Sequence, residues 1–201
     1  QRAKANAFMV KTSSADLAVA RKQVDVQSLI AAYRFLGSRW ADLDPLKRQE
    51  RPNIPELDPA FYGFVESDKE ISFSATNTYF SKADHMTLRE IVQALRETYC
   101  GSIGAEFMHI TDPGEKRWWQ EKLESVRSKP TYTVEKKKHI LDRLTAAEGL
   151  ERFLHTKYVG QKRFSLEGGE SFIAAMDELI QGAGEKGIQE IVIGKIGRAH
   201  V

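Results

Sequence analysis

Cysteine is almost absent from this sequence of 201 residues, and charge of neither sign dominates it. The single cysteine, Cys100, excludes an internal disulfide, and its place at the end of an apolar stretch predicts a buried thiol in a reducing compartment. Lys and Arg number 30 and Asp and Glu 28, a net charge of +2, which is too small to gather nucleic acid or acidic lipid. No run approaches the roughly 18 apolar residues of a membrane span. We therefore expect a soluble chain that binds neither nucleic acid nor membrane.

Several motifs of known chemistry are also missing. The five histidines show no metal-ligand spacing, so a metal site is not expected. Neither a Ser-based nucleophile elbow nor a Walker phosphate loop occurs. The chain starts at Gln1 without an initiating Met or the apolar core of a signal peptide, which suggests an upstream portion that has been cut away. The length still allows one or two domains with a real hydrophobic core.

The first part of the chain changes character near Val26. Residues 1–25 are small and polar and predict a linker or weakly ordered arm, although Asp25 can cap a helix that starts after it. From Val26 to Trp40 apolar residues recur at helical spacing, which predicts a helix. Four prolines then forbid long helices between residues 44 and 62. The segment 70–80 fits either a short strand or a loop.

Two later helices have clear start signals. Thr87 and Glu90 form a capping box, with Met86 and Ile91 placed to staple it, so a helix is predicted from Leu88 to about residue 99, ended by a glycine at 101. Farther along, an Asp-Pro pair at 112–113 with an acid at 115 is a second signal for the start of a helix. The apolar residues at 119, 123 and 126 share one face of that helix.

The last third predicts the opening of an α/β domain. A helical stretch runs from Val134, and a capping box of Thr145 with Glu148 indicates that it splits near residue 144. A further helix is expected at 170–183. Ile191–Ile193 form a short apolar run typical of a strand covered on both faces. The predicted fold class is therefore α/β: a predominantly helical fragment with an N-terminal helical region, followed by the opening helix and strand of an α/β domain.

Few residues stand out as functional candidates. The adjacent pair Trp118 and Trp119 is better explained by packing in a core or between domains than by a nucleic-acid stacking platform, because no basic face surrounds it. His109 is expected to be a hydrogen-bonded structural histidine and His155 a residue on the surface of a helix. The densest polar cluster spans 157–170, where Arg163 lies near two glycines that lead into a helix, an arrangement that attracts carboxylate or phosphate. The alternative, which residue types alone favour, is an ion-paired loop in which Arg163 meets the acid at 167 or 170.

This cluster also carries a family resemblance. The stretch LTAAEGLERFLHTKYVGQKRFSLEGGES, residues 144–171, resembles a hallmark of the thiamine-dependent first components of 2-oxoglutarate dehydrogenase complexes. Ser38 departs from the histidine that the family often has there. Three more stretches occur in family order: LIAAYRFLGSRWADLDPL at 29–46, TLREIVQALRETYCGSIGAEFMHI at 87–110 and EKRWWQEKLE at 115–124.

The resemblance implies a homodimeric bacterial cytoplasmic oxidoreductase of the tricarboxylic acid cycle. Such an enzyme uses thiamine diphosphate and magnesium to decarboxylate 2-oxoglutarate, and passes the succinyl group to the lipoyl domain of a dihydrolipoyl succinyltransferase component. The family holds the metal with an Asp-Gly motif, and no Asp-Gly pair occurs here. The resemblance therefore implies an inactive fragment without catalytic, cofactor-binding or metal residues, in which Arg163, Phe164 and Glu167 are candidates for the active-site entrance.

These expectations divide the chain into four parts. Residues 1–25 are the arm, 26–132 the N-terminal helical region with its proline-rich connection, and 133–194 the start of the thiamine diphosphate-binding domain. The family pattern stops after Gly194, and the heptapeptide 195–201 resembles a translated sequencing adapter, so it is expected to be a non-native tail. A competing hypothesis is a self-standing helical interaction domain whose Trp118 and Trp119 surface docks a partner chain.

Overall fold

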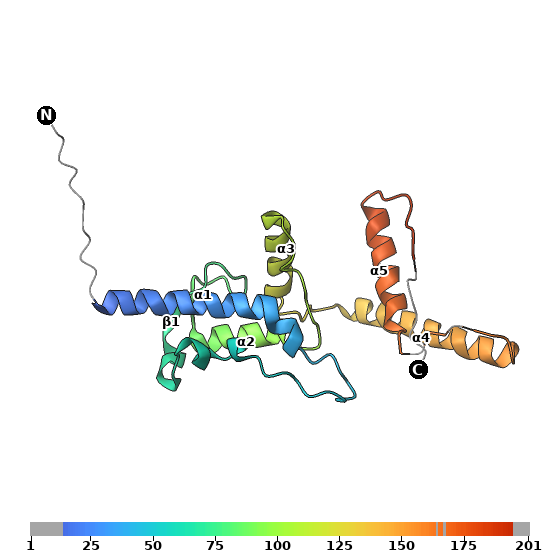
Figure 1. The fold of residues 1–201 in the computed structure, drawn as a ribbon. Helices are drawn as coiled ribbons and strands as arrows, with labels where there is room; N and C mark the ends of the chain where they lie inside the picture. Colours follow the sequence, from blue (N-terminus) through green and yellow to red (C-terminus); the bar gives the residue numbers. More distant parts are fainter. Residues whose placement is uncertain (1–13, 164, 167, 195–201) are drawn as a thin grey trace. The chain divides into compact units, whose positions relative to one another are not determined.

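The computed structural model describes residues 14–163, 165–166 and 168–194. The chain divides into two compact units, residues 1–131 and 132–201, and each is considered by itself. In the first unit the helices α1 (Ser14–Trp40) and α2 (Leu88–Tyr99) lie side by side (Figure 1). Three short 3-10 helices, η1 (Pro55–Leu57), η2 (Pro59–Tyr62) and η3 (Glu66–Glu70), lie in the connection between them. A third helix, α3 (Pro113–Glu124), stands across the direction of α1.

The apolar faces of α1 and α2 form the centre of the hydrophobic core. Their inward side chains are almost completely buried, and Phe64, Phe73 and Phe107 of the connecting segments close the core around them. Gly37 allows the close helix contact, because a Cβ atom at this position would lie 2.6 Å from the Cβ of Tyr99. The buried face of α1 carries Val26, Leu29, Ile30 and Tyr33, and that of α2 carries Leu88, Ile91, Ala94, Leu95 and Tyr99.

The predicted arm is wrong for residues 14–25, because α1 begins at Ser14 and Asp25 lies inside it rather than at its start. Residues 17–21, Leu-Ala-Val-Ala-Arg, include several strong helix formers, and nothing in this stretch breaks a helix. Tertiary partners also hold it. Lys22 Nζ lies 2.5 Å from Asp68 Oδ1, and Gln23 pairs with the backbone of Ser74, accepting from its N–H at 2.8 Å and donating to its carbonyl at 3.1 Å.

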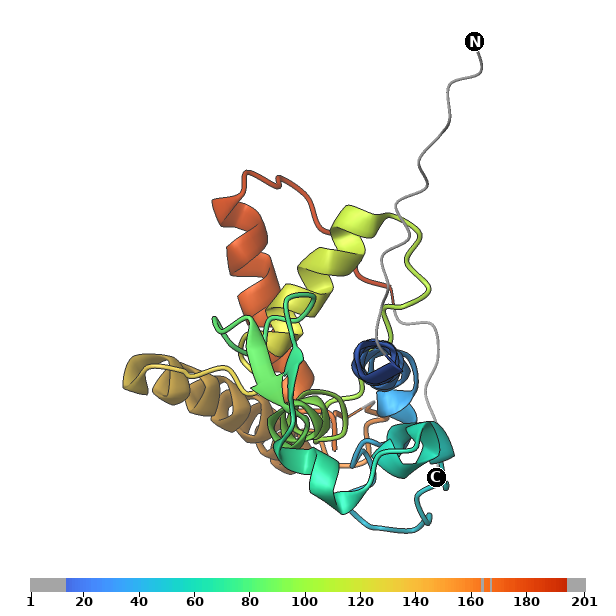
Figure 2. The ribbon, with the colours of Figure 1, turned by 90° about the vertical axis from the view of Figure 1, so that its left-hand side faces the viewer.

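The open choice at residues 70–80 resolves into a short strand. β1 (Ser72–Ser74) pairs antiparallel with β2 (His85–Thr87), with Phe73 opposite Met86. Figure 2 looks along α1 and shows this two-stranded ribbon beside α2. Both Phe73 and Met86 are buried, so the ribbon covers one end of the core.

The start signals of α2 and α3 are confirmed. Thr87 Oγ1 accepts from the Glu90 N–H at 3.2 Å while Glu90 accepts from the Thr87 N–H at 2.8 Å, which is the capping box. Asp112 accepts from the Glu115 N–H at 2.7 Å, with a proline at the first helical position. The C-cap of α2 is Cys100, one residue before the glycine expected to end the helix.

In the second unit, α4 (Val134–Lys157) and α5 (Ser171–Glu185) pack against each other. The expected split of α4 is wrong, because Thr145 Oγ1 donates to the Leu141 carbonyl at 2.8 Å and leaves the helical ladder intact. The predicted helix at 170–183 is confirmed within two residues. Across the described part of this unit only Ala147 is a buried apolar residue.

The predicted strand at Ile191–Ile193 is wrong for this chain. These residues form no strand, and Val192 is 95% exposed. A strand needs a neighbour to receive its backbone hydrogen bonds, and the only strands in the described residues, β1 and β2, already pair with each other. The observed architecture is therefore helical with one small two-stranded sheet. No described helix is both long and apolar enough to cross a membrane.

Candidate functional site

The loop after α4 places Arg163 against that helix. Its Nη1 donates to the Glu151 carbonyl at 2.9 Å and lies 3.6 Å from the Glu151 carboxylate, and its Nη2 lies 3.0 Å from His155 Nδ1. The same carboxylate accepts from the Leu166 N–H at 3.3 Å. Arg163 is therefore ion-paired, as the favoured reading of the cluster predicted. Among the described residues its partner is Glu151 on α4, however, and not Glu170 of its own loop.

Two other candidates of this loop, Phe164 and Glu167, lie outside the described residues. Glu170, the second acid considered as a partner for Arg163, instead accepts from the Gly168 N–H at 3.2 Å. Gly168 has a φ of +81°, which favours glycine, so this turn is set by local backbone geometry.

A groove of about 750 Å³ runs along α4 beside this loop. Its described lining holds three carboxylates against two guanidinium groups, and both cations are paired: Arg152 with Glu148 at 2.6 Å and Arg163 with Glu151. A site with cations free to bind phosphate would show a surplus of positive charge, and this groove has none. Its lining residues are Leu141, Leu144, Thr145, Glu148, Glu151, Arg152, His155, Thr156, Arg163 and Glu170.

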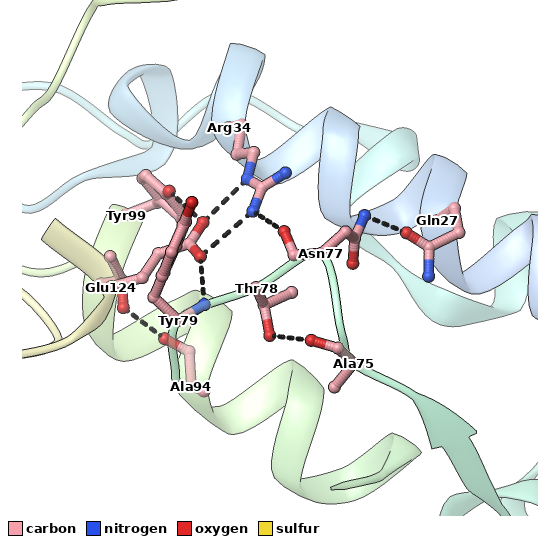
Figure 3. Close-up of polar contacts among 10 residues, drawn as sticks. Gln27, Arg34, Ala75, Asn77, Thr78, Tyr79, Ala94, Tyr99 and Glu124 are labelled. Carbon is pink, nitrogen blue, oxygen red and sulfur yellow. Dashed lines mark hydrogen bonds and ion pairs between the residues drawn. The ribbon is translucent and has the colours of Figure 1, made fainter. Parts of the chain in front are cut away.

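The strongest polar cluster lies elsewhere, at the centre of the first unit, and sequence reasoning missed it. Glu124, at the end of α3, is 0% exposed, and its two oxygens accept four hydrogen bonds (Figure 3). Arg34 of α1 donates from Nε at 2.8 Å and from Nη2 at 3.1 Å. The Tyr99 hydroxyl donates at 2.7 Å and the Tyr79 N–H at 3.0 Å. The four donors fill the acceptor positions of one carboxylate.

The rest of this cluster keeps the groups in fixed positions. Arg34 also donates from Nη2 to the Asn77 carbonyl at 2.8 Å, so one guanidinium ties α1 to both α3 and the 75–79 loop. Burial and then the neighbouring carboxylate raise the pKa of Tyr99, which keeps its hydroxyl a proton donor. One signal was available in the sequence, because Arg34 lies four residues after Ile30 and eight after Val26, on the apolar face of α1.

The remaining candidates are placed as follows. Cys100 is buried, as predicted, and burial raises the pKa of its thiol to about 11, which makes it a weak nucleophile. Trp118 is 50% exposed and Trp119 39% exposed, and they contact each other edge to face. Neither is therefore packed in the core of this unit, and packing between domains, the other form of the expectation, stays a prediction. His109 and His155 are exposed.

The described residues gather no set of three acidic, histidine or cysteine side chains that could hold a metal ion. A magnesium ion prefers an octahedral shell of oxygens, often one or two carboxylates with phosphate and water. The oxygens of the most buried carboxylate, Glu124, already accept hydrogen bonds from Arg34, Tyr99 and Tyr79. The described part of this chain therefore does not fit a magnesium diphosphate by itself.

Comparison with known proteins gives one consistent result. A Cupriavidus necator protein named 2-oxoglutarate dehydrogenase E1 component is 68% identical over 201 residues, which are 100% of this chain and 21% of that protein. The chain matches the N-terminal part of 2-oxoglutarate dehydrogenase E1 components. The E1 component of Azotobacter vinelandii is 47% identical over 96% of this chain and 20% of its own length, and that of Haemophilus influenzae 45% over 92% and 20%. No protein-family model matches the chain.

The E1 match bears out the resemblance seen in the sequence. The chain spans about a fifth of the length of the curated relatives it matches. All four quoted stretches lie within the 201 residues that align with the C. necator E1 component. Residues 195–201 also fall within that alignment and lie outside the described residues, so their non-native origin stays a prediction.

Proposed function

We propose that this chain acts as the N-terminal helical part of a bacterial cytoplasmic 2-oxoglutarate dehydrogenase E1 component, an oxidoreductase of the tricarboxylic acid cycle. The observation that carries the proposal is 68% identity to one such protein over the whole chain. In the complete enzyme, thiamine diphosphate with magnesium supplies the decarboxylating chemistry on 2-oxoglutarate. The succinyl group then passes to the lipoyl domain of a succinyltransferase component, and the enzyme works as a homodimer.

This chain takes no catalytic step of its own in the proposal. Its described residues do not gather a metal-binding set, and the sequence has no Asp-Gly pair. We therefore expect the chain alone to be inactive and to bind neither cofactor nor magnesium. Its role is structural. The α1–α2 core and the Glu124 cluster hold in place the surface against which the remainder of an E1 component packs.

The second unit is the proposed start of the thiamine diphosphate-binding domain. Its support is the apolar surface that the unit leaves exposed on α4, on α5 and at residues 188–193. Exposed apolar patches of this kind mark surfaces that are covered in an assembly. A neighbouring strand would also supply the backbone partners that the described residues do not give to Ile191–Ile193. The large exposed residues on these elements are Val134, Leu141, Leu150, Phe153, Phe172, Leu179, Ile180, Ile188, Ile191, Val192 and Ile193.

Arg163, Phe164 and Glu167 remain the proposed contributors to the active-site entrance. The described contacts support a positioning role for Arg163, because its bonds to Glu151 and His155 fix the loop on α4. Arg163→Lys keeps the charge but loses the forked geometry. In the complete enzyme we expect this change to raise KM for 2-oxoglutarate more than it lowers kcat.

A second candidate function has one observation in its favour. Trp118 and Trp119 expose much of their surface on α3, and exposed tryptophans are enriched at protein interfaces. A self-standing helical interaction domain would use them to dock a partner chain. Such a domain would work without the rest of an E1 component, and this is where the two functions differ.

The test replaces the matching stretch of the C. necator E1 component with residues 14–194 of this chain. Isothermal titration then measures thiamine diphosphate binding with and without magnesium, for this chimera, for the unmodified E1 component and for the isolated chain. We expect saturable, magnesium-dependent heat for the first two and none for the third. Saturable heat from the isolated chain, or a folded dimeric chimera that binds no cofactor, would contradict the proposal.

A further inference from the structure

Hydrogen-bond donors surround the Glu124 carboxylate in the way that they surround a bound carboxylate ligand. One carboxylate, completely buried, receives a two-pronged contact from Arg34, a hydroxyl from Tyr99 and a backbone amide from Tyr79. Forked guanidinium contacts of this kind are the strong and specific way in which proteins bind carboxylates. The donors come from α1, from α2 and from the loop at 75–79, and the carboxylate comes from α3 alone.

The donor side is held in place without help from α3. Arg34 is 9% exposed and is anchored by the Asn77 carbonyl. Tyr99 lies in the α1–α2 core, stacked on Phe107 with ring centres 6.3 Å apart. Tyr79 follows the buried Thr78, whose hydroxyl donates to the Ala75 carbonyl at 2.7 Å. These contacts do not involve Glu124, so we expect the three donors to keep their geometry when the carboxylate is removed.

The helix that delivers the carboxylate is attached mainly by polar contacts. The buried residues of α3 are Gln120 and Glu124, and from its apolar residues only Leu123 packs against the core. Trp118 and Trp119 point to a largely exposed surface. Segments with few buried apolar contacts open locally at a lower free energy than the core around them.

We propose that Arg34, Tyr99 and the Tyr79 backbone amide form a carboxylate-binding site, and that Glu124 occupies it as an internal ligand carried on a detachable α3. When α3 is docked, the site is closed to other anions. When α3 opens, the site can accept the carboxylate of a small molecule. The internal ligand thus makes docking of α3 and binding of an external carboxylate mutually exclusive.

The experiment removes the internal ligand and supplies one from solution. Glu124→Ala deletes the carboxylate and the carbon beside it, and acetate contains the missing atoms. In the full 201-residue chain, we expect sodium acetate to raise the urea midpoint of Glu124→Ala saturably, and sodium chloride of the same ionic strength to leave it unchanged. The Tyr79 amide proton in the NMR spectrum of this variant should shift along the same saturation curve.

Three matched chains serve as controls. Glu124→Gln and the unmodified chain should respond to acetate much more weakly than Glu124→Ala, because their own side chain competes for the site. The double variant Arg34→Met, Glu124→Ala should not respond because the site has lost its cation. If Glu124→Ala is unfolded in buffer, acetate and not chloride should restore its helical circular dichroism. An acetate response that matches that of chloride, or one that survives in the double variant, would overturn the proposal.

Discussion

Replacing Arg34 by Met should be among the most damaging single changes in the first unit. The change removes both guanidinium contacts to Glu124 and leaves a carboxylate that is 0% exposed with only the Tyr99 hydroxyl and the Tyr79 amide as donors. Breaking a buried ion pair from one side costs about 3–5 kcal/mol, because the remaining charge is buried and uncompensated. We therefore expect Arg34→Met to lower the free energy of unfolding by about 3–5 kcal/mol.

The double variant Arg34→Met, Glu124→Leu separates this cause from loss of packing. It removes both charges, so no uncompensated carboxylate remains. The Tyr99 hydroxyl and the Tyr79 amide lose their acceptor, and the Asn77 carbonyl loses its donor, as it does in Arg34→Met. Each such unsatisfied group costs about 1–3 kcal/mol if it stays buried. The expected order is that the double variant is at least as stable as Arg34→Met alone, which means that the two changes are strongly non-additive.

Tryptophan fluorescence during urea unfolding is a suitable assay. The three tryptophans, Trp40, Trp118 and Trp119, all lie in the first unit, so the signal reports on that unit. Arg89→Met is the matched control, because its pair with Glu70 is exposed on both sides and such pairs contribute about 0–1 kcal/mol. Equal destabilisation by Arg34→Met and Arg89→Met, or a double variant clearly less stable than Arg34→Met, would refute the reasoning.

Three further changes test other parts of the fold. Thr87→Ala removes the cap of α2 and should lower the free energy of unfolding by about 1 kcal/mol; an unchanged urea midpoint would count against the capping box. Gly37→Ala places a Cβ 2.6 Å from that of Tyr99 and should cost about 1–3 kcal/mol, whereas no loss would mean that α1 and α2 can separate freely. The Lys22 ammonium lowers the pKa of Asp68, so this carboxylate contributes stability above its ordinary pKa of about 3.9 and loses it as the pH falls through its lowered value. Asp68→Asn should therefore reduce the fall of the urea midpoint at acid pH. If the midpoint falls as steeply in this variant as in the unmodified chain, the Lys22–Asp68 pair is not the cause of the fall.

The features predicted correctly from the sequence depend on neighbours along the chain. The caps at Thr87 and Asp112 were found because the cap and the amide that it accepts from are three residues apart. The same local rule failed at Thr145, whose hydroxyl bonds back to Leu141 and leaves α4 unbroken. A side chain that can cap a helix can also sit inside one, and only the flanking residues decide between the two.

The features that were missed depend on partners far away in the sequence. Lys22 and Gln23 hold the first turns of α1 through residues about 50 positions later. Glu124 meets Arg34 across 90 positions. The strand expected at Ile191 has the right composition but no neighbour within the described residues. Composition and periodicity carry no information on such pairings, so the polar centre of the first unit became visible only in the structure.

Turnover by the chimera tests the central claim most directly. The measurement is oxidative decarboxylation of 2-oxoglutarate by the C. necator E1 component carrying residues 14–194 of this chain, with ferricyanide as the electron acceptor. If this chain is the N-terminal part of an E1 component, the chimera should be dimeric and turn over at a rate within about tenfold of the unmodified enzyme, which corresponds to a barrier difference of about 1.4 kcal/mol. A chimera that is folded and dimeric but has no measurable turnover would contradict the claim.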